Sequence, residues 1–361
     1  MSGPSRILLV ESDAKVALSL ATAFRQQGWE VVAASDAAMA MAVALKTRPN
    51  AIVINTEVPG GGGLTALKRL RTSIHTAATP VIVVGQHATT QKQEFLSAGA
   101  QECIEPPSHA AALCAAIQKH LARPQTVFEA PREALRDATR MAALKASGLL
   151  DSAPEQSFDR VTQLAAKLLG VPVALLSLVD KDRQFFKSQV GLSEPWATAR
   201  QTPLSHSFCQ WVVSGRESIA IEDANAHPLL RTNLAIRDLG VIAYAGVPVY
   251  GKEGQALGSL CAIDTMPRAW TDVDLATLHD LRKLAEACAA QFELAQQPPT
   301  KVSDFDRYVE ATGNAISGAL GILRRGGPML SPSESNTLFD VIEQHGQHLV
   351  QLNRLIQLRE H

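Results

Sequence analysis

The sequence has little net charge, few cysteines and no long apolar run. It carries 34 Lys and Arg against 35 Asp and Glu, so no excess of positive charge favours nucleic-acid binding. No apolar run reaches the roughly 18 residues that a membrane span requires. Five cysteines without regular spacing favour reduced thiols over a disulfide framework. With an N-terminus that lacks the layout of a signal peptide, these absences predict a cytoplasmic protein without a membrane span.

What the chain does contain is enough for two or three domains. Its 361 residues are 46% hydrophobic and 19% charged, which is typical of folded domains with ordinary cores. The hydrophobic pattern changes along the chain, and Pro124 and Pro298-Pro299 mark the connectors. We therefore expect a multidomain chain of α/β, α+β and all-α parts, with boundaries at 1–123, 124–298 and 299–361.

The first segment alternates short apolar runs with stretches of helical composition. Such runs are typical of buried parallel strands, and the alternation predicts a doubly wound sheet. We expect strands at 7–10, 31–33, 51–54 and 81–84, and helices at 14–27, 37–46, 64–72 and 109–121.

Residues 6–121 resemble response-regulator receiver domains. The resemblance is carried by the strings ILLVESD, NAIVINTEVPGGGG, PVIVVG and SAGAQECIEPP. It implies a flavodoxin-like fold in which an aspartate accepts a phosphoryl group beside Mg²⁺ held by neighbouring carboxylates. It also implies that a helix near 90–98 contacts partner proteins.

The positions that serve phosphorylation in this family are changed here. Asn55 stands where the acceptor aspartate should be, and an amide cannot form an acyl phosphate. The acidic pair, the hydroxyl and the lysine of the family are also incomplete or missing. We therefore expect a pseudo-receiver that binds proteins, is not phosphorylated and holds no metal. The degenerate positions are Glu11, Ser12, Asp13, Asn55, Gly85 and Glu105.

The second segment contains strand-like runs between helical flanks, which predicts an α+β domain. The strings SHSFCQWVV, IEDANAHPLL and AYAGVPVYGKEGQALGSLCAIDTMPRAWT resemble GAF domains, which implies a sheet with flanking helices. We expect strands at 172–179, 185–190, 219–221, 243–249 and 258–263, with helices in 131–169 and 272–296. A solvated hairpin is expected to hold Asp180, Asp182, Arg183 and Lys187.

The GAF resemblance specifies a fold but not a ligand. Domains of this family variously bind cyclic nucleotides, bilins, haem, small metabolites or nothing known, so we expect no cofactor and leave a ligand open. A pocket would lie between the sheet and residues 207–244, with His206, Cys209, Tyr244 and Cys261 as its candidate residues. His206 could bind haem or a metal and the thiols a bilin, but a core histidine and core thiols are the preferred interpretation.

The third segment predicts a helical hairpin over residues 303–358. A turn at Gly326-Gly327-Pro328 joins two apolar stripes, and 331–334 supplies helix-capping residues. Two such helices cannot bury a core alone, so we expect a homodimer in which two hairpins form a four-helix bundle. The expected interface residues are Ile316, Ile322, Leu338, Ile342, His345, Leu349 and Leu352.

This hairpin resembles the dimerisation and phosphotransfer hairpin of sensor histidine kinases. The strings ISGALGIL and LSPSESNTLFDVIEQHGQHLVQLNRLIQL carry the resemblance. The position of the phosphorylated histidine of that family holds Glu310 here, and we find no ATP-binding domain after the hairpin. His345 and His348 on the second helix fit an interface better than phosphotransfer.

Taken together, these features predict an adaptor of a bacterial phosphorelay that is not an enzyme. Its expected partners are a second copy of the chain and a histidine kinase, phosphotransfer protein or response regulator. Two alternatives stay open. The chain could be a hybrid sensor histidine kinase or a fragment of one, or a receptor in which a small molecule occupies the GAF domain.

Overall fold

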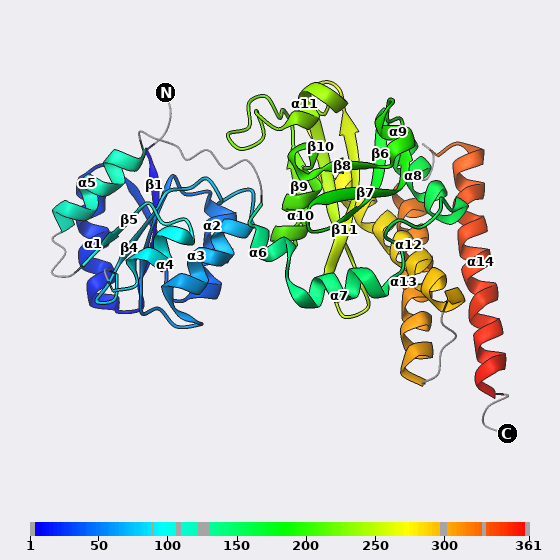
Figure 1. Cartoon of the computed structure of the whole chain (residues 1–361), viewed down its shortest axis with the longest axis horizontal. Coiled ribbons are helices and arrows are strands. Elements are labelled where there is room, and N and C mark those ends of the chain that lie inside the picture. Colours follow the sequence, from blue (N-terminus) through cyan, green and yellow to red (C-terminus); the bar gives the residue numbers. More distant parts are fainter. Residues whose placement is uncertain are drawn as a thin grey trace. The chain divides into compact units, whose positions relative to one another are not determined.

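The computed structural model of the chain describes residues 4–88, 90–105, 110–121, 130–296, 302–326 and 330–357. Side chains are described for these residues except for 302–308, 326 and 348–357. The chain divides into two compact units, 1–131 and 132–361, and each is considered by itself (Figure 1). Within the described residues, no helix combines the length and the apolar character that crossing a bilayer requires.

Unit 1 is built on a sheet of five parallel strands in the order β2-β1-β3-β4-β5. The strands are short apolar runs because both faces of the sheet are covered. This strand order places the carboxyl ends of β1 and β3 side by side, where ligands commonly bind in such sheets. The bounds are β1 (Arg6–Val10), β2 (Glu30–Ala34), β3 (Ala51–Asn55), β4 (Val81–Val84) and β5 (Glu102–Ile104).

Helices cover both faces of this sheet, which confirms the doubly wound, flavodoxin-like prediction. Phe24 and Ile117 pack with Val53 on one face, and Leu67 packs with Ile54 on the other, since successive strand residues point to opposite sides. The first face is covered by α1 (Ala14–Gln26) and α5 (Ala110–Leu121), and the second by α2 (Ala37–Thr47), α3 (Gly62–Thr72) and α4 (Lys92–Ser97).

Unit 2 contains an antiparallel sheet of six strands in the order β8-β7-β6-β11-β10-β9. Five of these strands were expected from the sequence; β8 was missed because its sequence, Gln-Thr-Pro, contains no apolar run. The sheet confirms the α+β prediction for this segment. The bounds are β6 (Val173–Val179), β7 (Arg183–Val190), β8 (Gln201–Pro203), β9 (Ile219–Ile221), β10 (Ala243–Tyr250) and β11 (Ala256–Asp264).

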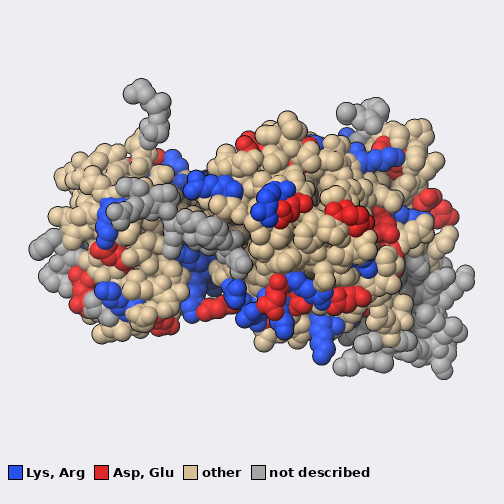
Figure 2. All heavy atoms as spheres, turned by 45° about the horizontal axis from the view of Figure 1, so that its top comes forward, with Lys and Arg blue, Asp and Glu red and all other residues tan. Residues whose placement is uncertain are grey.

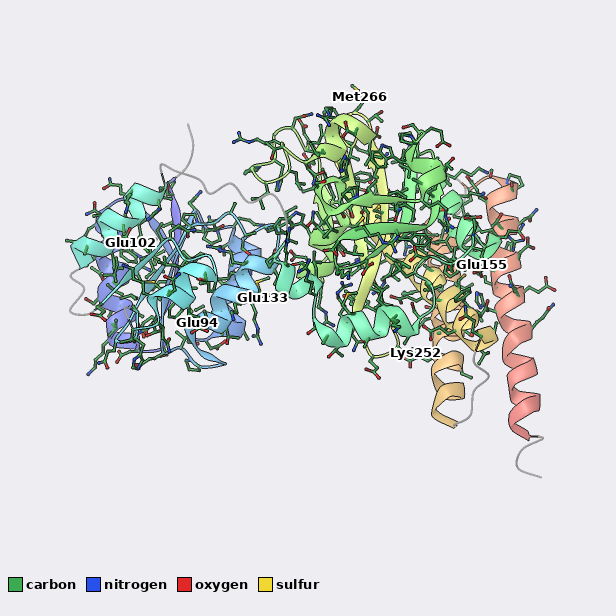
Figure 3. The ribbon with its side chains drawn as sticks, in the orientation of Figure 1. Glu94, Glu102, Glu133, Glu155, Lys252 and Met266 are labelled. Atoms are coloured by element: carbon green, nitrogen blue, oxygen red, sulfur yellow. The ribbon has the colours of Figure 1, made fainter. Side chains whose placement is uncertain are left out.

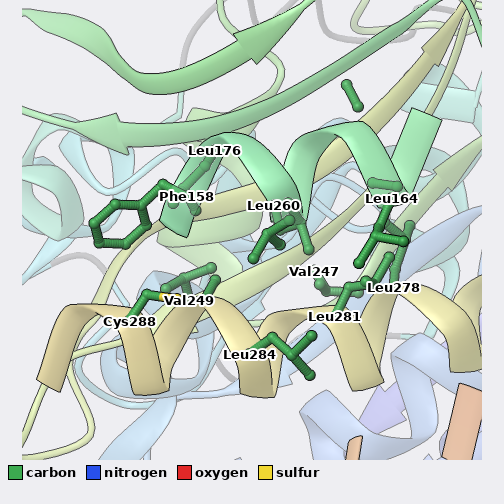
Figure 4. Packing of buried hydrophobic residues seen from close by; sticks show 14 of the residues in the cluster. Phe158, Leu164, Leu176, Val247, Val249, Leu260, Leu278, Leu281, Leu284 and Cys288 are labelled. Carbon is green, nitrogen blue, oxygen red and sulfur yellow. The ribbon is translucent and has the colours of Figure 1, made fainter. Parts of the chain in front are cut away.

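One face of this sheet packs against two long helices, α8 (Gln156–Leu169) and α12 (Asp272–Gln296). Figure 4 shows Phe158 and Leu164 of α8 and Leu281 of α12 meeting Val247 and Leu260 of the sheet. The remaining helices before the C-terminal hairpin are short. They are α6 (Arg132–Leu135), α7 (Ala138–Ala146), α9 (Trp196–Ala199), the 3₁₀ helix η1 (Leu204–His206), α10 (Cys209–Gly215) and α11 (Leu234–Leu239).

The C-terminal hairpin, α13 (Val302–Gly326) and α14 (Pro332–Gln357), packs on α12 of its own chain. The contact is close, because a Cβ on Gly318 would lie 2.6 Å from the backbone oxygen of Asp280. The Asp280 carboxylate is bonded by Lys283, at 2.8 Å, and by Arg325 of α13. The apolar stripe therefore finds core partners within the chain, whereas the sequence led us to expect a second copy to cover it. Residues 327 and 328 of the expected turn lie outside the described residues.

The expectation that Lys187 lies in a solvated hairpin is wrong. Its side chain is fully buried, and Nζ donates to Ser152 Oγ at 2.6 Å, to a backbone carbonyl and to Glu155 Oε1 at 2.8 Å (Glu155 is labelled in Figure 3). The rings of Phe158 and Phe292 lie 4.9 and 4.7 Å from the ammonium. Burial lowers the pKa of Lys187. All three ammonium donors have partners, so the buried charge is tolerated.

Charges of both signs are mixed on the surface that Figure 2 shows, with Lys and Arg lying among Asp and Glu. Ion pairs such as Lys119–Glu102 at 2.9 Å in unit 1 and Arg136–Asp182 at 2.6 Å in unit 2 are examples. Exposed pairs of this kind add about 0–1 kcal/mol each to stability, so they do not determine the fold.

Two glycines of α13 offer a matched test of its contact with α12. We expect Gly318→Ala to destabilise the α12–α13 contact by about 1–3 kcal/mol, because the new methyl group meets backbone. Gly313→Ala, where a Cβ meets nothing within 4 Å, should instead stabilise α13 by about 0.5–1 kcal/mol. Hydrogen exchange of α13 peptides measures both effects. Equal changes in the two variants would show that α13 does not pack on α12 as described.

Candidate functional site

The first candidate site lies where β1 and β3 end, and it centres on Asn55. Asn55 Nδ2 donates to Glu11 Oε2 at 2.6 Å, and Asn55 Oδ1 accepts from the backbone N–H of Glu57 at 3.0 Å. Glu11 is only 6% exposed, and its other oxygen accepts from the backbone N–H of Asp13 at 2.9 Å. The polar groups of Asn55 and Glu11 are therefore bonded within the site.

The second carboxylate of this loop, Asp13, has a structural role in α1. Its Oδ1 accepts from the backbone N–H groups of Lys15 at 2.8 Å and Val16 at 3.1 Å, so Asp13 is the N-cap of the helix. Ser12 is exposed in the same loop. Of the two carboxylates in the loop, one is bonded to Asn55 and the other to a helix terminus.

The end of β4 has no room for a side chain. Gly85 has a φ of +143°, and a Cβ there would lie 2.0 Å from Thr56 Oγ1 and 3.0 Å from Asn55 Oδ1. The Thr56 side chain occupies the space where the expected hydroxyl residue would project. Glu105 is exposed after β5 and makes none of these contacts. Sequence reasoning missed Thr56, although it directly follows Asn55.

The second candidate site is a small cavity on the face of the unit 2 sheet opposite α8 and α12. Its volume is about 20 Å³, enough for one water-sized molecule. Known pockets for small organic ligands measure about 300–1,000 Å³. Three of the four expected pocket residues, His206, Cys209 and Tyr244, line the cavity, and Cys261 lies behind Cys209. The other lining residues are Val173, Leu175, Gln184, Phe186, Leu192, Phe208, Ala235, Leu239, Val241 and Ile263.

His206 is held by partners on both ring nitrogens. Nε2 lies 3.0 Å from Asp238 Oδ2, and Nδ1 lies 3.1 Å from Ser205 Oγ. The ring also packs on Trp196, with centroids 5.2 Å apart. Hydrogen bonds from Arg237 and from His206 hold the pKa of Asp238 well below its usual range. These contacts favour the interpretation of His206 as a core histidine, and they add Asp238, which the sequence did not single out.

The two thiols beside the cavity share a polar environment with Tyr244. The Sγ atoms of Cys209 and Cys261 are 3.9 Å apart, and the Tyr244 hydroxyl donates to Cys209 Sγ at 3.4 Å. Ser259 Oγ lies 3.3 Å from the same hydroxyl. The Cys261 thiol and then the Tyr244 hydroxyl lower the pKa of Cys209, whereas burial raises the pKa of Cys261 well above its usual value. The two thiols also differ in geometry, because Cys209 contacts the Tyr244 hydroxyl and lines the cavity.

A larger cavity of about 310 Å³ lies between α8, α12 and α14. Arg160, Cys288 and Gln344 are among its lining residues, and Gln291 Nε2 lies 3.0 Å from His345 Nδ1 in the same wall. Burial raises the pKa of Cys288 to about 12, which disfavours its thiolate form. The sequence could not indicate this cavity, because it exists only once α14 packs on the GAF helices.

The remaining predicted residues lie on the C-terminal hairpin. Glu310 is exposed on α13, and Ile316 is partly exposed. The side chains of Ile322 and Leu338 are buried in the core of unit 2, with Ile342 packed against it. The side chains of Leu349 and Leu352 lie outside the described part of the structure. Three of the expected interface residues, Ile322, Leu338 and His345, are thus already buried within one chain.

Comparison with known proteins identifies two domains. The family model described as "Response regulator receiver domain" matches residues 7–118, and the model described as "GAF domain" matches residues 153–295. The first match fits the parallel sheet of unit 1, and the second fits the antiparallel sheet of unit 2.

Three individual proteins illustrate these similarities. A cyclic di-GMP phosphodiesterase, PA2567 of Pseudomonas aeruginosa, is 33% identical over 151 residues, which is 41% of this chain and 25% of that protein. The transcriptional regulatory protein PrrA of Mycobacterium leprae is 33% identical over 119 residues, 33% of this chain and 50% of PrrA. The solved receiver domain of the Francisella response regulator 1452 is 26% identical, with a TM-score of 0.31, over 33% of this chain and 98% of that domain.

The chain spans about a quarter to a half of the length of these curated relatives. The phosphodiesterase among them overturns the expectation that the chain is not an enzyme, because a relative of this similarity is named for a catalytic activity. That expectation rests on the absence of phosphoacceptors, which does not bear on other chemistry. The chain contains a response regulator receiver domain and a GAF domain, a combination consistent with two-component signalling.

Proposed function

We propose that this chain is a two-component signalling regulator whose receiver domain binds its partner without being phosphorylated. The observation that carries the proposal is the 2.6 Å hydrogen bond from Asn55 Nδ2 to Glu11 Oε2. An amide at the acceptor position is not a nucleophile for phosphoryl transfer. The same bond engages a carboxylate that would otherwise be available to Mg²⁺.

The surroundings of Asn55 support a single, fixed state of this domain. Thr56 fills the space at Gly85, and Asp13 is engaged at the N-terminus of α1. Neither group is free to rearrange around a phosphoryl group without losing its present contacts. We assign partner binding to the surface around α4, on which Leu96 is 36% exposed. The partner class that fits a receiver domain is a histidine kinase or a phosphotransfer protein.

The GAF domain and the hairpin complete the proposal as sensing and pairing elements. Val309, Ile316 and Leu320 share one face of α13, since they are separated by seven and four residues. Val309 and Leu320 are 40% and 39% exposed, and Phe339 of α14 is 56% exposed. We propose that two copies of the chain pair through these exposed apolar residues, while the buried side of the hairpin remains on α12.

The direct test is a phosphodonor experiment with the full chain. We expect no covalent label from radiolabelled acetyl phosphate with Mg²⁺, because no carboxylate occupies position 55. Histidine kinases and phosphotransfer proteins of the host should be screened for binding by calorimetry. The affinity of the bound partner should be the same with and without acetyl phosphate. Stable label on the unmodified chain, or an affinity that changes more than threefold with the phosphodonor, would contradict the proposal.

A double-mutant cycle tests the Asn55–Glu11 network. Asn55→Asp places two carboxylates side by side, and we expect it to cost about 2–3 kcal/mol at pH 7; Glu11→Gln should cost about 1 kcal/mol. The double variant restores one amide and one carboxylate, so its cost should be at least 1 kcal/mol below the sum. Hydrogen exchange of β1 and β3 peptides measures these costs.

The pH dependence of Asn55→Asp provides a further check on the same pair. Two neighbouring carboxylates raise the pKa of one carboxyl group in the folded state. The folded form of this variant then binds one proton more readily than the unfolded form does. Its loss of stability should therefore shrink as the pH falls from 7 toward 5. Asn50→Asp is the matched control, because the Asn50 oxygen also accepts a backbone hydrogen bond, at 2.7 Å from Arg6 N. If the stability costs of Asn55→Asp and Glu11→Gln simply add in the double variant, the Asn55–Glu11 network is excluded.

Light scattering of the full chain tests the pairing surface. We expect twice the monomer mass for the unmodified chain and the monomer mass for Phe339→Glu, since a charge in an apolar interface is costly. Met266→Glu is the control, because Met266 is 67% exposed after β11, away from the hairpin (Figure 3). A monomeric unmodified chain, or equal effects of both substitutions, would exclude this surface.

A role in cyclic di-GMP turnover is the second candidate, and the 33% identity to the phosphodiesterase favours it. The aligned length of 151 residues is close to that of the GAF match at 153–295. Incubation of the full chain with cyclic di-GMP and Mg²⁺ or Mn²⁺, followed by chromatography of the nucleotides, decides it. Conversion to the linear dinucleotide would establish this activity in the chain.

A further inference from the structure

Two of the five cysteines are placed close enough together to react with each other. Cys209 begins α10 and Cys261 lies in β11, 52 positions apart in sequence, yet their sulfurs are 3.9 Å apart. A disulfide has an S–S distance of about 2.05 Å, so the two sulfurs need to approach by about 2 Å. Both side chains are buried, at 2% and 0% exposure, so the pair is held in one packed environment.

The cavity described above borders this pair and has room for a small molecule. Cys209 lines it, and its volume of about 20 Å³ suits a molecule the size of water. Two further lining residues, Leu192 and Leu239, are partly exposed, so this side of the cavity lies next to the surface of unit 2. Hydrogen peroxide is only slightly larger than water, whereas a tripeptide disulfide such as oxidised glutathione is far too large. The cavity therefore selects for a small oxidant.

The surroundings also distinguish the roles of the two thiols. The nucleophile in thiol oxidation is the thiolate, which is favoured where hydrogen-bond donors converge on the sulfur. Cys209 Sγ receives the Tyr244 hydroxyl at 3.4 Å and faces the Cys261 thiol. Cys209 also borders the cavity, whereas Cys261 lies behind it. Cys209 is thus the sulfur that meets the oxidant, and Cys261 is the sulfur positioned to resolve the product.

We propose that Cys209 and Cys261 form a redox modification site that hydrogen peroxide converts to a disulfide. The Cys209 thiolate attacks one peroxide oxygen, the O–O bond breaks, and hydroxide leaves, which gives a sulfenic acid on Cys209. The Cys261 sulfur then attacks Cys209 Sγ, and the sulfenic hydroxyl leaves as water with the Cys261 proton. Two thiols are oxidised, and one peroxide is reduced to two molecules of water after proton transfer to the hydroxide.

Disulfide formation changes the wall of the cavity. It moves Cys209 Sγ toward Cys261 and away from the Tyr244 hydroxyl, which keeps Ser259 Oγ at 3.3 Å as its partner. It also joins the start of α10 to the central strand β11 by a covalent bond. The oxidised and reduced forms therefore differ in how α10 is attached to the sheet.

The experiment uses the full chain, reduced and then exposed to hydrogen peroxide. Remaining thiols are blocked after unfolding, and the peptides are identified by mass spectrometry. We expect a Cys209–Cys261 disulfide peptide that dithiothreitol reverses, while Cys103, Cys114 and Cys288 stay blockable. Oxidised glutathione at the same oxidising equivalents should give at least tenfold less of this peptide. Peroxide oxidation at Cys103 or Cys114 without the Cys209–Cys261 peptide, or equal yields from the two oxidants, would overturn the proposal.

Variants assign the order of the two steps. Cys261→Ser should halt the reaction at a sulfenic acid on Cys209, which dimedone traps once the protein is unfolded. Cys209→Ser should leave Cys261 unmodified, and Cys288→Ser is the control that should form the disulfide at the wild-type rate. Dimedone labelling of Cys261 in Cys209→Ser would reverse the assigned order. The measurement on the unmodified chain does not depend on how well these variants fold.

Discussion

The architecture of unit 2 depends on the burial of α12 on two sides. Leu278, Leu281 and Leu284 are almost fully buried in the core that this helix forms with the sheet and α8 (Figure 4). Asp280 is also buried, and its carboxylate is paired with Lys283 and with Arg325 of α13. A buried carboxylate without partners costs several kcal/mol, so separation of α13 from α12 would remove one of the two cations that stabilise it. This helix therefore couples the sheet to the C-terminal hairpin.

In unit 1 the strand order determines which residues meet at the candidate site. It brings the ends of β1 and β3 together, so residues 44 positions apart meet at the same edge of the sheet. In this position a carboxylate facing a carboxylate would attract a cation, whereas a carboxylate facing the Asn55 amide forms a neutral-to-charged hydrogen bond and needs none. The Asn55–Glu11 hydrogen bond thus joins the two strand ends directly, and the proposal that this domain is not phosphorylated rests on it.

Much of this organisation could be predicted from the sequence because it depends on local patterns. Continuous apolar runs indicated the strands of unit 1, and the end of one such run identified Asn55. The contacts that the sequence could not indicate are long-range ones between residues that look unremarkable singly. From the sequence, Gly318 is an unfavourable residue inside a helix, whereas in the structure it allows close contact with Asp280. Lys187 is likewise expected at the surface, whereas in the structure Glu155 and two aromatic rings surround its ammonium group. The expectation about enzymatic activity was wrong for a different reason, because it rested on motifs that are absent.

The alternation of side chains along the strands connects the two faces of the GAF sheet. On β11, Cys261 lies on the cavity side, and its neighbours Leu260 and Ala262 belong to the core cluster that includes α8 and α12. Strands in the middle of a sheet are held by hydrogen bonds on both edges, so a shift of β11 moves both sets of side chains together. A disulfide at Cys261 would therefore form one residue along β11 from Leu260 and Ala262, whose side chains pack in the helical layer. Because α12 carries the hairpin on its far side, the thiol pair and the hairpin are linked by a continuous path of packed residues within one unit.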